Sequence, residues 1–161
     1  MNSLLRIAPA VFLAVTAPRV RAQGPLPDAL GQARETLHRV APHDCAAPSA
    51  AEITALQHAA GVFRGAGDAP EEAQALKTLG ALYDRTAQYQ AAIPVLQRAA
   101  RIAPDDRLRV QAETLLADAL HSVDRAPEAL DLLRGTIHRA HRMGDSALEA
   151  DALRVRGEIQ Y

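Results

Sequence analysis

The chain has 161 residues, of which 48% are hydrophobic, 23% are charged and only 3% are aromatic. This length suffices for one core of domain size, or for one continuous stack of small units. Because Ala and Leu are abundant and aromatic residues are scarce, closely packed helices are favoured over a β-sandwich or a β-barrel. We therefore predict an all-α fold.

The first residues have the pattern of an export signal. A polar start with Arg6 precedes the apolar run Ile7–Val15, and Val20 and Ala22 occupy the −3 and −1 positions of a signal-peptidase site. The run is shorter than the about 20 residues that span a bilayer. We predict a signal peptide over residues 1–22 and an exported chain, periplasmic or secreted. The alternative is that this segment is an N-terminal helix.

Removing the signal makes the chain more acidic. Residues 1–22 contain three arginines and no acid, so 15 basic and 19 acidic residues remain after cleavage. Proteins that bind nucleic acids usually present a basic face. We therefore expect no nucleic-acid binding, and no stable membrane insertion once the signal is removed.

Apolar periodicity predicts seven helices after the signal, over residues 27–41, 50–64, 70–85, 88–103, 107–123, 126–143 and 146–161. Pro70 and Pro127 suit first helical turns, and Glu71 and Glu72 suit the positive end of a helix dipole. Pro94 lies about a turn inside its helix, where a kink is expected.

Cys45, in the long connection between the first two predicted helices, is the only cysteine of the chain. An exported protein with one thiol has no internal disulfide, so packing must supply its stability. His43 and Asp44 precede it directly, but neighbours in a loop rarely face each other in a catalytic arrangement. We interpret Cys45 as an incidental thiol; a reactive or intermolecular role is the alternative.

Internal repeats decide the predicted architecture. The segment ITALQHAA, which begins at Ile53, recurs 40 residues later as IPVLQRAA, which begins at Ile93. The segment LGALY, which begins at Leu79, is echoed 37 residues later by LADAL. Small side chains at Gly80 and Ala92 would let the two helices of one hairpin approach closely.

The most complete copy resembles the tetratricopeptide repeat, a helix–turn–helix unit of about 34 residues. The matching residues are Leu79, Gly80, Tyr83, Ala92, Leu96, Ala99 and Pro104. The next copy is weaker, because Thr136 and His141 replace the later Ala and Pro. The resemblance implies a right-handed α-solenoid of stacked antiparallel hairpins over residues 23–161. Its units would cover about 26–66, 70–106 and 107–143, with the start of another at 146–161.

In that family the first helix of each hairpin lines a concave face, and fixed positions of it point into the groove. The resemblance therefore implies a partner-binding surface for a protein or an extended peptide. Its residues would be Gln74, Lys77, Asp84, Arg85, Gln111, Thr114, Asp118, His121, Arg154 and Glu158. Ala81 stands where capture of a C-terminal carboxylate would need Asn, so that mode is not expected. The alternative is that these are ordinary exposed residues of a helical spacer.

The sequence has no residue pattern typical of an enzyme, such as a Gly-rich phosphate loop, GxSxG or HExxH. His138 and His141, with Asp145 beyond them, have a spacing that can bind a metal if another helix adds ligands. Arg139 and Arg142 flank them, which disfavours a cation. We predict no catalytic residues, no metal and no cofactor.

The function expected from these patterns is that of a non-catalytic interaction scaffold. The alternative is the sensor or interaction arm of a larger enzyme, such as a caspase-like peptidase or a signalling kinase. It is suggested by the repeat pattern, which reaches Tyr161 one helix into a new unit. An exposed last helix would also permit association between copies of the chain.

Overall fold

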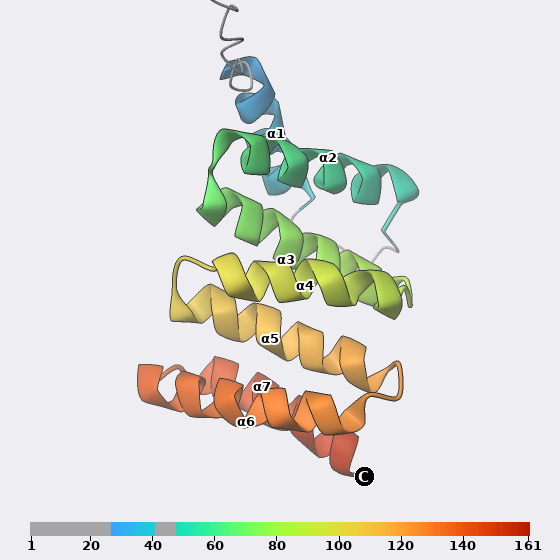
Figure 1. Ribbon diagram of the computed structural model, residues 1–161, viewed down its shortest axis with the longest axis vertical. Coiled ribbons are helices and arrows are strands. Elements are labelled where there is room, and N and C mark those ends of the chain that lie inside the picture. Colours follow the sequence, from blue (N-terminus) through green and yellow to red (C-terminus); the bar gives the residue numbers. More distant parts are fainter. Residues whose placement is uncertain (1–26, 41–47) are drawn as a thin grey trace, which may run out of the picture.

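The computed structural model describes residues 27–40 and 48–161, which form seven helices and no strand (Figure 1). The helices are α1 (Pro27–Arg39), α2 (Ala50–Ala66), α3 (Ala69–Arg85), α4 (Tyr89–Ile102), α5 (Asp106–His121), α6 (Ala126–Met143) and α7 (Ser146–Gln160). The all-α prediction is confirmed, and each predicted helix end is correct within two residues. The predicted signal peptide and Cys45 lie outside the described residues. Within those residues, no helix combines the length and apolar character that a membrane crossing needs.

The helices are arranged in two layers. Each helix packs against the next one in the chain, and α3 also packs against α1 and α5, as α5 does against α7. The even-numbered helices make no such contacts with one another. We call α1, α3, α5 and α7 the first-helix layer, and α2, α4 and α6 the second-helix layer. Figure 1 shows the helices stacked along the long axis, from α1 and α2 at one end, through α3, α4 and α5, to α6 and α7 at the other.

Side-chain caps start most of the helices. Ser49 caps α2, where its hydroxyl accepts a hydrogen bond from the Glu52 backbone N–H and the Glu52 carboxylate accepts one from the Ser49 N–H. Asp105 caps α5 by accepting from the Leu108 N–H at 2.7 Å. The same arrangement, with Asp68 and Asp145, starts α3 and α7. Such caps satisfy backbone donors that have no partner within the helix.

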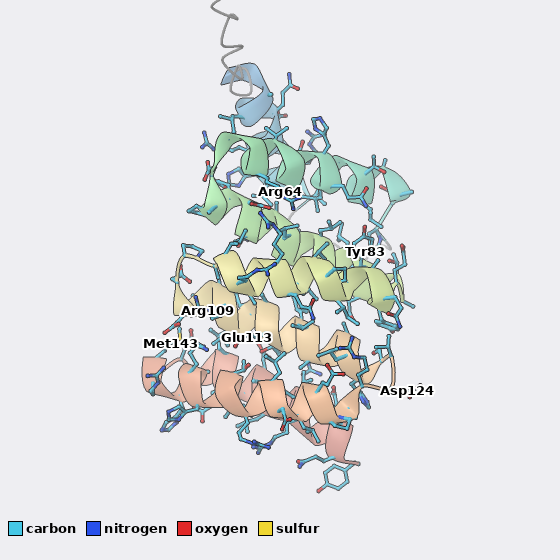
Figure 2. All side chains as sticks on the ribbon, viewed as in Figure 1. Arg64, Tyr83, Arg109, Glu113, Asp124 and Met143 are labelled. Atoms are coloured by element: carbon cyan, nitrogen blue, oxygen red, sulfur yellow. The ribbon has the colours of Figure 1, made fainter. Side chains whose placement is uncertain are left out.

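Four helices end with one shared turn geometry. A residue with a left-handed backbone follows each of them, at Gly67, Ala87, Asp124 and Gly144, with φ between 55° and 73°. The next residue then donates its N–H to a carbonyl five positions back, as Gln88 does to Tyr83 at 2.8 Å. Ala87 and Asp124 are 37 residues apart, which is the spacing of the sequence repeat. Asp124 marks the turn between α5 and α6 in Figure 2.

Gly80 permits the close approach of α3 and α4. It is buried, and a Cβ atom placed on it would lie only 2.5 Å from Cγ of Leu96, a side chain that is itself fully buried. Ala92, on the facing helix, is also fully buried. The structure thus confirms the role predicted for Gly80 as a spacer between the helices of one hairpin.

We expect Gly80→Ala to destabilise the protein, although alanine normally stabilises a helix interior by about 0.5–1 kcal/mol relative to glycine. The added methyl group must displace Leu96, and overpacking of this kind costs about 1–3 kcal/mol. Gly135→Ala in α6 is the matched control, because a Cβ atom there meets nothing within 4 Å. Urea unfolding should show opposite signs for the two substitutions. A gain in stability with both would contradict the contact between α3 and α4.

A buried carboxylate links three helices. The side chain of Glu72, in α3, is 5% exposed, and its Oε1 accepts hydrogen bonds from Nε of Arg64 in α2 at 2.7 Å and from Nε of Arg98 in α4 at 2.6 Å. Arg64, the partner from α2, is labelled in Figure 2. The sequence suggested only a helix-dipole role for Glu72, because residues 8 and 26 positions away are not visible as partners in a linear pattern. Burial acts to raise the pKa of Glu72, but the hydrogen bonds from Arg98 and Arg64 outweigh it and hold the pKa below its ordinary value of 4.5.

Removing this charge should cost stability. We expect Glu72→Gln to lower the free energy of unfolding at pH 7 by about 2 kcal/mol, because two guanidinium groups lose their carboxylate partner. A depressed pKa in the folded state gives stability that is present above pH 4.5 and is lost as the pH falls through the folded-state pKa. The substitution should therefore flatten the acid limb of a stability profile.

Glu128→Gln is the matched control. Glu128 pairs with Arg125 at an equally short 2.6 Å, but its side chain is 58% exposed, so its loss should change stability little. Equal effects of the two substitutions would show that the Glu72 contacts do not stabilise the stack.

Candidate functional site

The first-helix layer carries a hollow of about 290 Å³ between α3, α5 and α7. Its apolar and hydroxyl-bearing lining comes from Thr78, Ala81, Thr114, Leu115 and Leu148, and its charged and amide groups come from Lys77, Gln111, Asp151 and Arg154. Each of the three helices contributes at least two residues. No single hairpin forms this hollow; it exists only because successive first helices pack against one another.

Lys77 provides a cationic group at the hollow without an ion-pair partner. Its Nζ donates a hydrogen bond to Oε1 of Gln111 at 3.4 Å, and it has no carboxylate within ion-pairing distance among the described residues. Burial lowers the pKa of Lys77. An ammonium group in this position can still bind an acceptor that a partner brings.

Three carboxylates lie one turn beyond the hollow. Asp84 follows Ala81 by three residues in α3, Asp118 follows Leu115 by three in α5, and Glu158 follows Arg154 by four in α7, so each shares a helix face with the hollow. We call Asp84, Asp118 and Glu158 the acidic row.

Only one member of the acidic row is paired. The Arg154 guanidinium donates to both carboxylate oxygens of Glu158, at 2.7 and 2.9 Å. In the described part of the chain, neither Asp84 nor Asp118 has a basic side chain within ion-pairing distance. Asp84 and Asp118 therefore lack a direct ion-pair partner among the described residues, although Arg154 and His121 lie near enough to Asp118 to favour its charged form in part.

The surroundings disfavour the charged forms of both aspartates. Burial raises the pKa of Asp84 above its ordinary value of 3.8, and the nearby Asp118 raises it further. Burial also raises the pKa of Asp118, followed by Glu158, whereas Arg154 and His121 offset part of this rise. Both aspartates lie in the last turn of their helices, where the helix dipole also disfavours a negative charge. At neutral pH these two charges oppose folding.

We therefore expect the Asp84→Asn and Asp118→Asn double variant to be more stable than the wild type at pH 7, by about 1 kcal/mol. The pKa values of both aspartates are raised in the folded state, so both become protonated as the pH falls toward 3.8. Protonation removes the unfavourable charges from the wild type, and the difference in stability between wild type and variant should then disappear. Thermal unfolding at pH 7 and at pH 4 measures the two limits. A double variant that is less stable at pH 7 would show that the carboxylates have stabilising partners.

The structure brings together most of the residues predicted to bind a partner. Lys77, Gln111, Thr114 and Arg154 line the hollow, and Asp84, Asp118 and Glu158 form the acidic row. His121 is close enough to Asp118 to act on its pKa.

Gln74 and Arg85, also predicted to bind a partner, belong neither to the hollow nor to the acidic row. Gln74 is half-buried in α3 and does not line the hollow. Arg85 is exposed, and it lies near enough to Glu52 in α2 to contribute to the lowered pKa of that carboxyl, although the hydrogen bonds from Ser49 contribute most and burial opposes them.

The prediction missed the residues that form the floor of the hollow. Thr78 and Leu115 stand next to the predicted Lys77 and Thr114, whereas Leu148 lies six residues before the predicted Arg154. Their apolar and hydroxyl-bearing side chains look like ordinary core residues in the sequence. An inspection of every residue adjacent to the predicted groove positions would have found Thr78 and Leu115.

The histidines of α6 make a different contact. Nδ1 of His141 lies 3.2 Å from Oε1 of Glu149 in α7, and the His141 side chain is largely exposed. Arg139 lies between His138 and His141 in the sequence, and its Nη1 is 3.3 Å from Oδ1 of Asp106 in α5. Across the described ranges, no group of three or more His, Cys, Asp and Glu side chains gathers in a way that could hold a metal ion.

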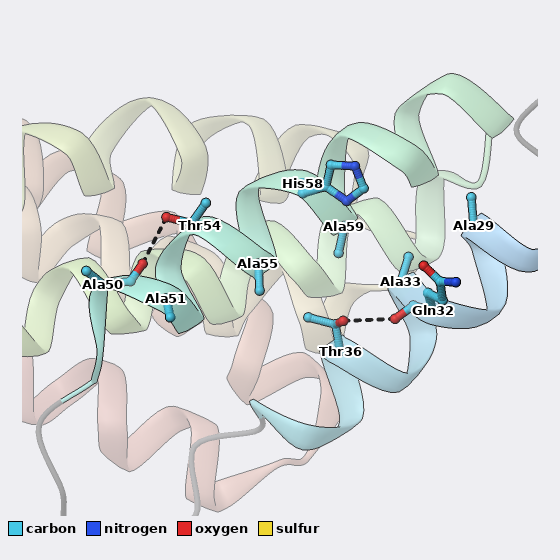
Figure 3. A pocket seen from close by; sticks show the side chains of 10 residues that line it. All are labelled: Ala29, Gln32, Ala33, Thr36, Ala50, Ala51, Thr54, Ala55, His58 and Ala59. Atoms are coloured by element: carbon cyan, nitrogen blue, oxygen red, sulfur yellow. Dashed lines mark hydrogen bonds between the residues drawn. The ribbon is translucent and has the colours of Figure 1, made fainter.

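A second hollow, between α1 and α2, has a larger volume and is lined mainly by small residues (Figure 3). Its volume is about 630 Å³, and six of its lining residues are alanines. The hydroxyls of Thr36 and Thr54 donate to the carbonyls of Gln32 and Ala50 in their own helices (Figure 3). These walls therefore offer few free polar groups, and we assign no site to them.

Comparison with protein-family models finds no match, and comparison with curated proteins finds none either. The function is therefore inferred from the hollow, the acidic row and the repeat pattern of the chain.

Proposed function

We propose that this chain is a scaffold of the tetratricopeptide type, a right-handed α-solenoid that is exported and binds a protein or an extended peptide across its first-helix layer. The observation that carries the proposal is the hollow to which α3, α5 and α7 all contribute. A binding surface shared by successive first helices is what the resemblance implies for this architecture.

The recurrence of turn geometry supports the repeat assignment. The left-handed residues Ala87 and Asp124 follow the first helices of two successive hairpins, at the same 37-residue spacing as the sequence repeat. Gly67 and Gly144 have the same conformation after α2 and α6, at the ends of second helices. Units that repeat both sequence and turn geometry are the basis of a solenoid.

The chemistry of the hollow favours binding over catalysis. The hydroxyls of Thr78 and Thr114 both donate at 2.9 Å to backbone carbonyls one turn earlier, so neither is poised as a nucleophile. The remaining polar groups are an ammonium, a guanidinium, an amide and a carboxylate. These groups match the carbonyls, amides and charged side chains of a peptide. A few polar groups around an apolar floor is the usual composition of a recognition site.

A display library of random peptides, selected against the whole chain, tests the proposal. We expect enriched peptides whose affinity changes about tenfold or more, about 1.4 kcal/mol, in the Lys77→Ala and Arg154→Ala double variant. The affinity should fall for peptides that bring hydrogen-bond acceptors or acids to these two side chains, and rise for basic peptides. Arg134→Ala is the control, because Arg134 lies in the second-helix layer with an 81% exposed side chain. Fluorescence anisotropy gives the dissociation constants, and circular dichroism checks that each variant is folded.

Two outcomes count against the proposal. One is the absence of any enriched peptide. The other is a set of peptides that bind the wild type and the Lys77 and Arg154 double variant equally well, because such peptides would bind elsewhere on the chain.

A further inference from the structure

We infer that the hollow takes a basic extended segment of a partner: an apolar side chain enters the hollow, and two basic residues three positions apart lie over Asp84 and Asp118. This inference rests on the proposed function and specifies the chemistry of the partner.

The floor of the hollow selects an apolar side chain. Ala81, Leu115 and Leu148 contribute hydrocarbon, and the hydroxyls of Thr78 and Thr114 are already bonded to their own helices. A volume of about 290 Å³ has room for a side chain from a partner. Burial of apolar surface there is favourable, whereas a charged group would lose its hydration without gaining a partner on the floor.

The charges around the hollow select basic flanking residues. Asp84, Asp118, Asp151 and Glu158 outnumber Lys77 and Arg154, and the one short ion pair among them joins Arg154 to Glu158. Lys77 lies seven residues before Asp84, or about 10 Å along α3, and it is hydrogen-bonded to Gln111. Asp84 and Asp118 have no ion-pair partner among the described residues, and they lie close enough for Asp118 to add to the effect of burial in raising the pKa of Asp84. A cationic group between the two carboxylates would relieve their mutual repulsion.

The separation of α3 and α5, the helices that carry the two aspartates, selects the spacing of the basic residues. Asp84 and Asp118 lie on α3 and α5, which pack directly against each other, and packed helices are about 8–10 Å apart. An extended segment of the polyproline II type has three residues per turn and rises about 3.1 Å per residue. Residues i and i+3 of such a segment therefore point the same way and are about 9 Å apart. This match favours two basic residues separated by two others.

Four synthetic peptides separate these requirements. The parent is APPRLPRPPA, labelled with fluorescein, in which the two arginines are three positions apart and enclose a leucine. APPRLPPRPA has the same composition with the arginines four positions apart. The other two carry glutamine or glutamate at both arginine positions of the parent. Anisotropy titrations at low ionic strength measure the four dissociation constants for the whole chain.

We expect the parent to bind about tenfold or more tightly than the glutamine and glutamate peptides, and severalfold more tightly than the respaced peptide. On the Asp84→Asn and Asp118→Asn double variant the parent should lose this advantage. That variant is expected to be more stable than the wild type, so unfolding does not explain a loss of binding. Asp131→Asn is the matched control, because Asp131 lies in α6 and its side chain is 75% exposed.

Several results would overturn the inference. Equal binding of the parent and the glutamine peptide would remove the basic requirement, as would a preference that survives in the aspartate double variant. Equal binding of the parent and the respaced peptide would refute the spacing requirement. Failure of the parent to bind at all would refute the inferred partner chemistry as a whole. If library peptides that are not basic still bind at the hollow, the proposed function stands and only this inference fails. If no library peptide binds there, the proposed function itself fails.

Discussion

The packing of α5 between α3 and α7 is the contact on which the candidate site depends. Each helix has one apolar stripe, and a single hairpin leaves part of that stripe in water. Burial of the stripes against the next hairpin supplies the driving force for stacking. Because the same contacts bring the polar edges of three helices together, the hollow is a consequence of how the core is formed. A change that separates α5 from α3 would therefore disrupt both the core and the hollow.

Two kinds of partly or fully buried carboxylate occur in this protein, and they affect stability in opposite ways. Glu72 receives hydrogen bonds from Arg64 and Arg98, so its charged form stabilises the junction of three helices. Within the described residues, Asp84 and Asp118 receive no hydrogen bond from an arginine, and burial disfavours their charged forms more than Arg154 and His121 favour that of Asp118. A surface that keeps uncompensated charges at some cost in stability is a candidate for binding, because a partner can supply the missing opposite charge.

The turns explain how a chain with imperfect repeats keeps a regular stack. Glycine adopts the left-handed conformation at Gly67 and Gly144 with little strain, whereas Ala87 and Asp124 adopt it despite their side chains. Among residues other than glycine, aspartate tolerates this conformation better than alanine does. The hydrogen bond that closes each turn, from the residue after the left-handed one, is conserved between the hairpins even where the residue type is not.

The amino-acid sequence by itself determined the helices, because apolar periodicity and capping residues act over distances of a few residues along the chain. The repeat pattern also indicated the spacer role of Gly80, whose contact is with Leu96 on the facing helix. The tertiary structure alone decided the partners of Glu72 and the part of the hollow's lining formed by Thr78, Leu115 and Leu148. These features depend on how far each helix is shifted and rotated against its neighbours. That offset is set by the packing of many side chains at once, so no local pattern in the sequence specifies it.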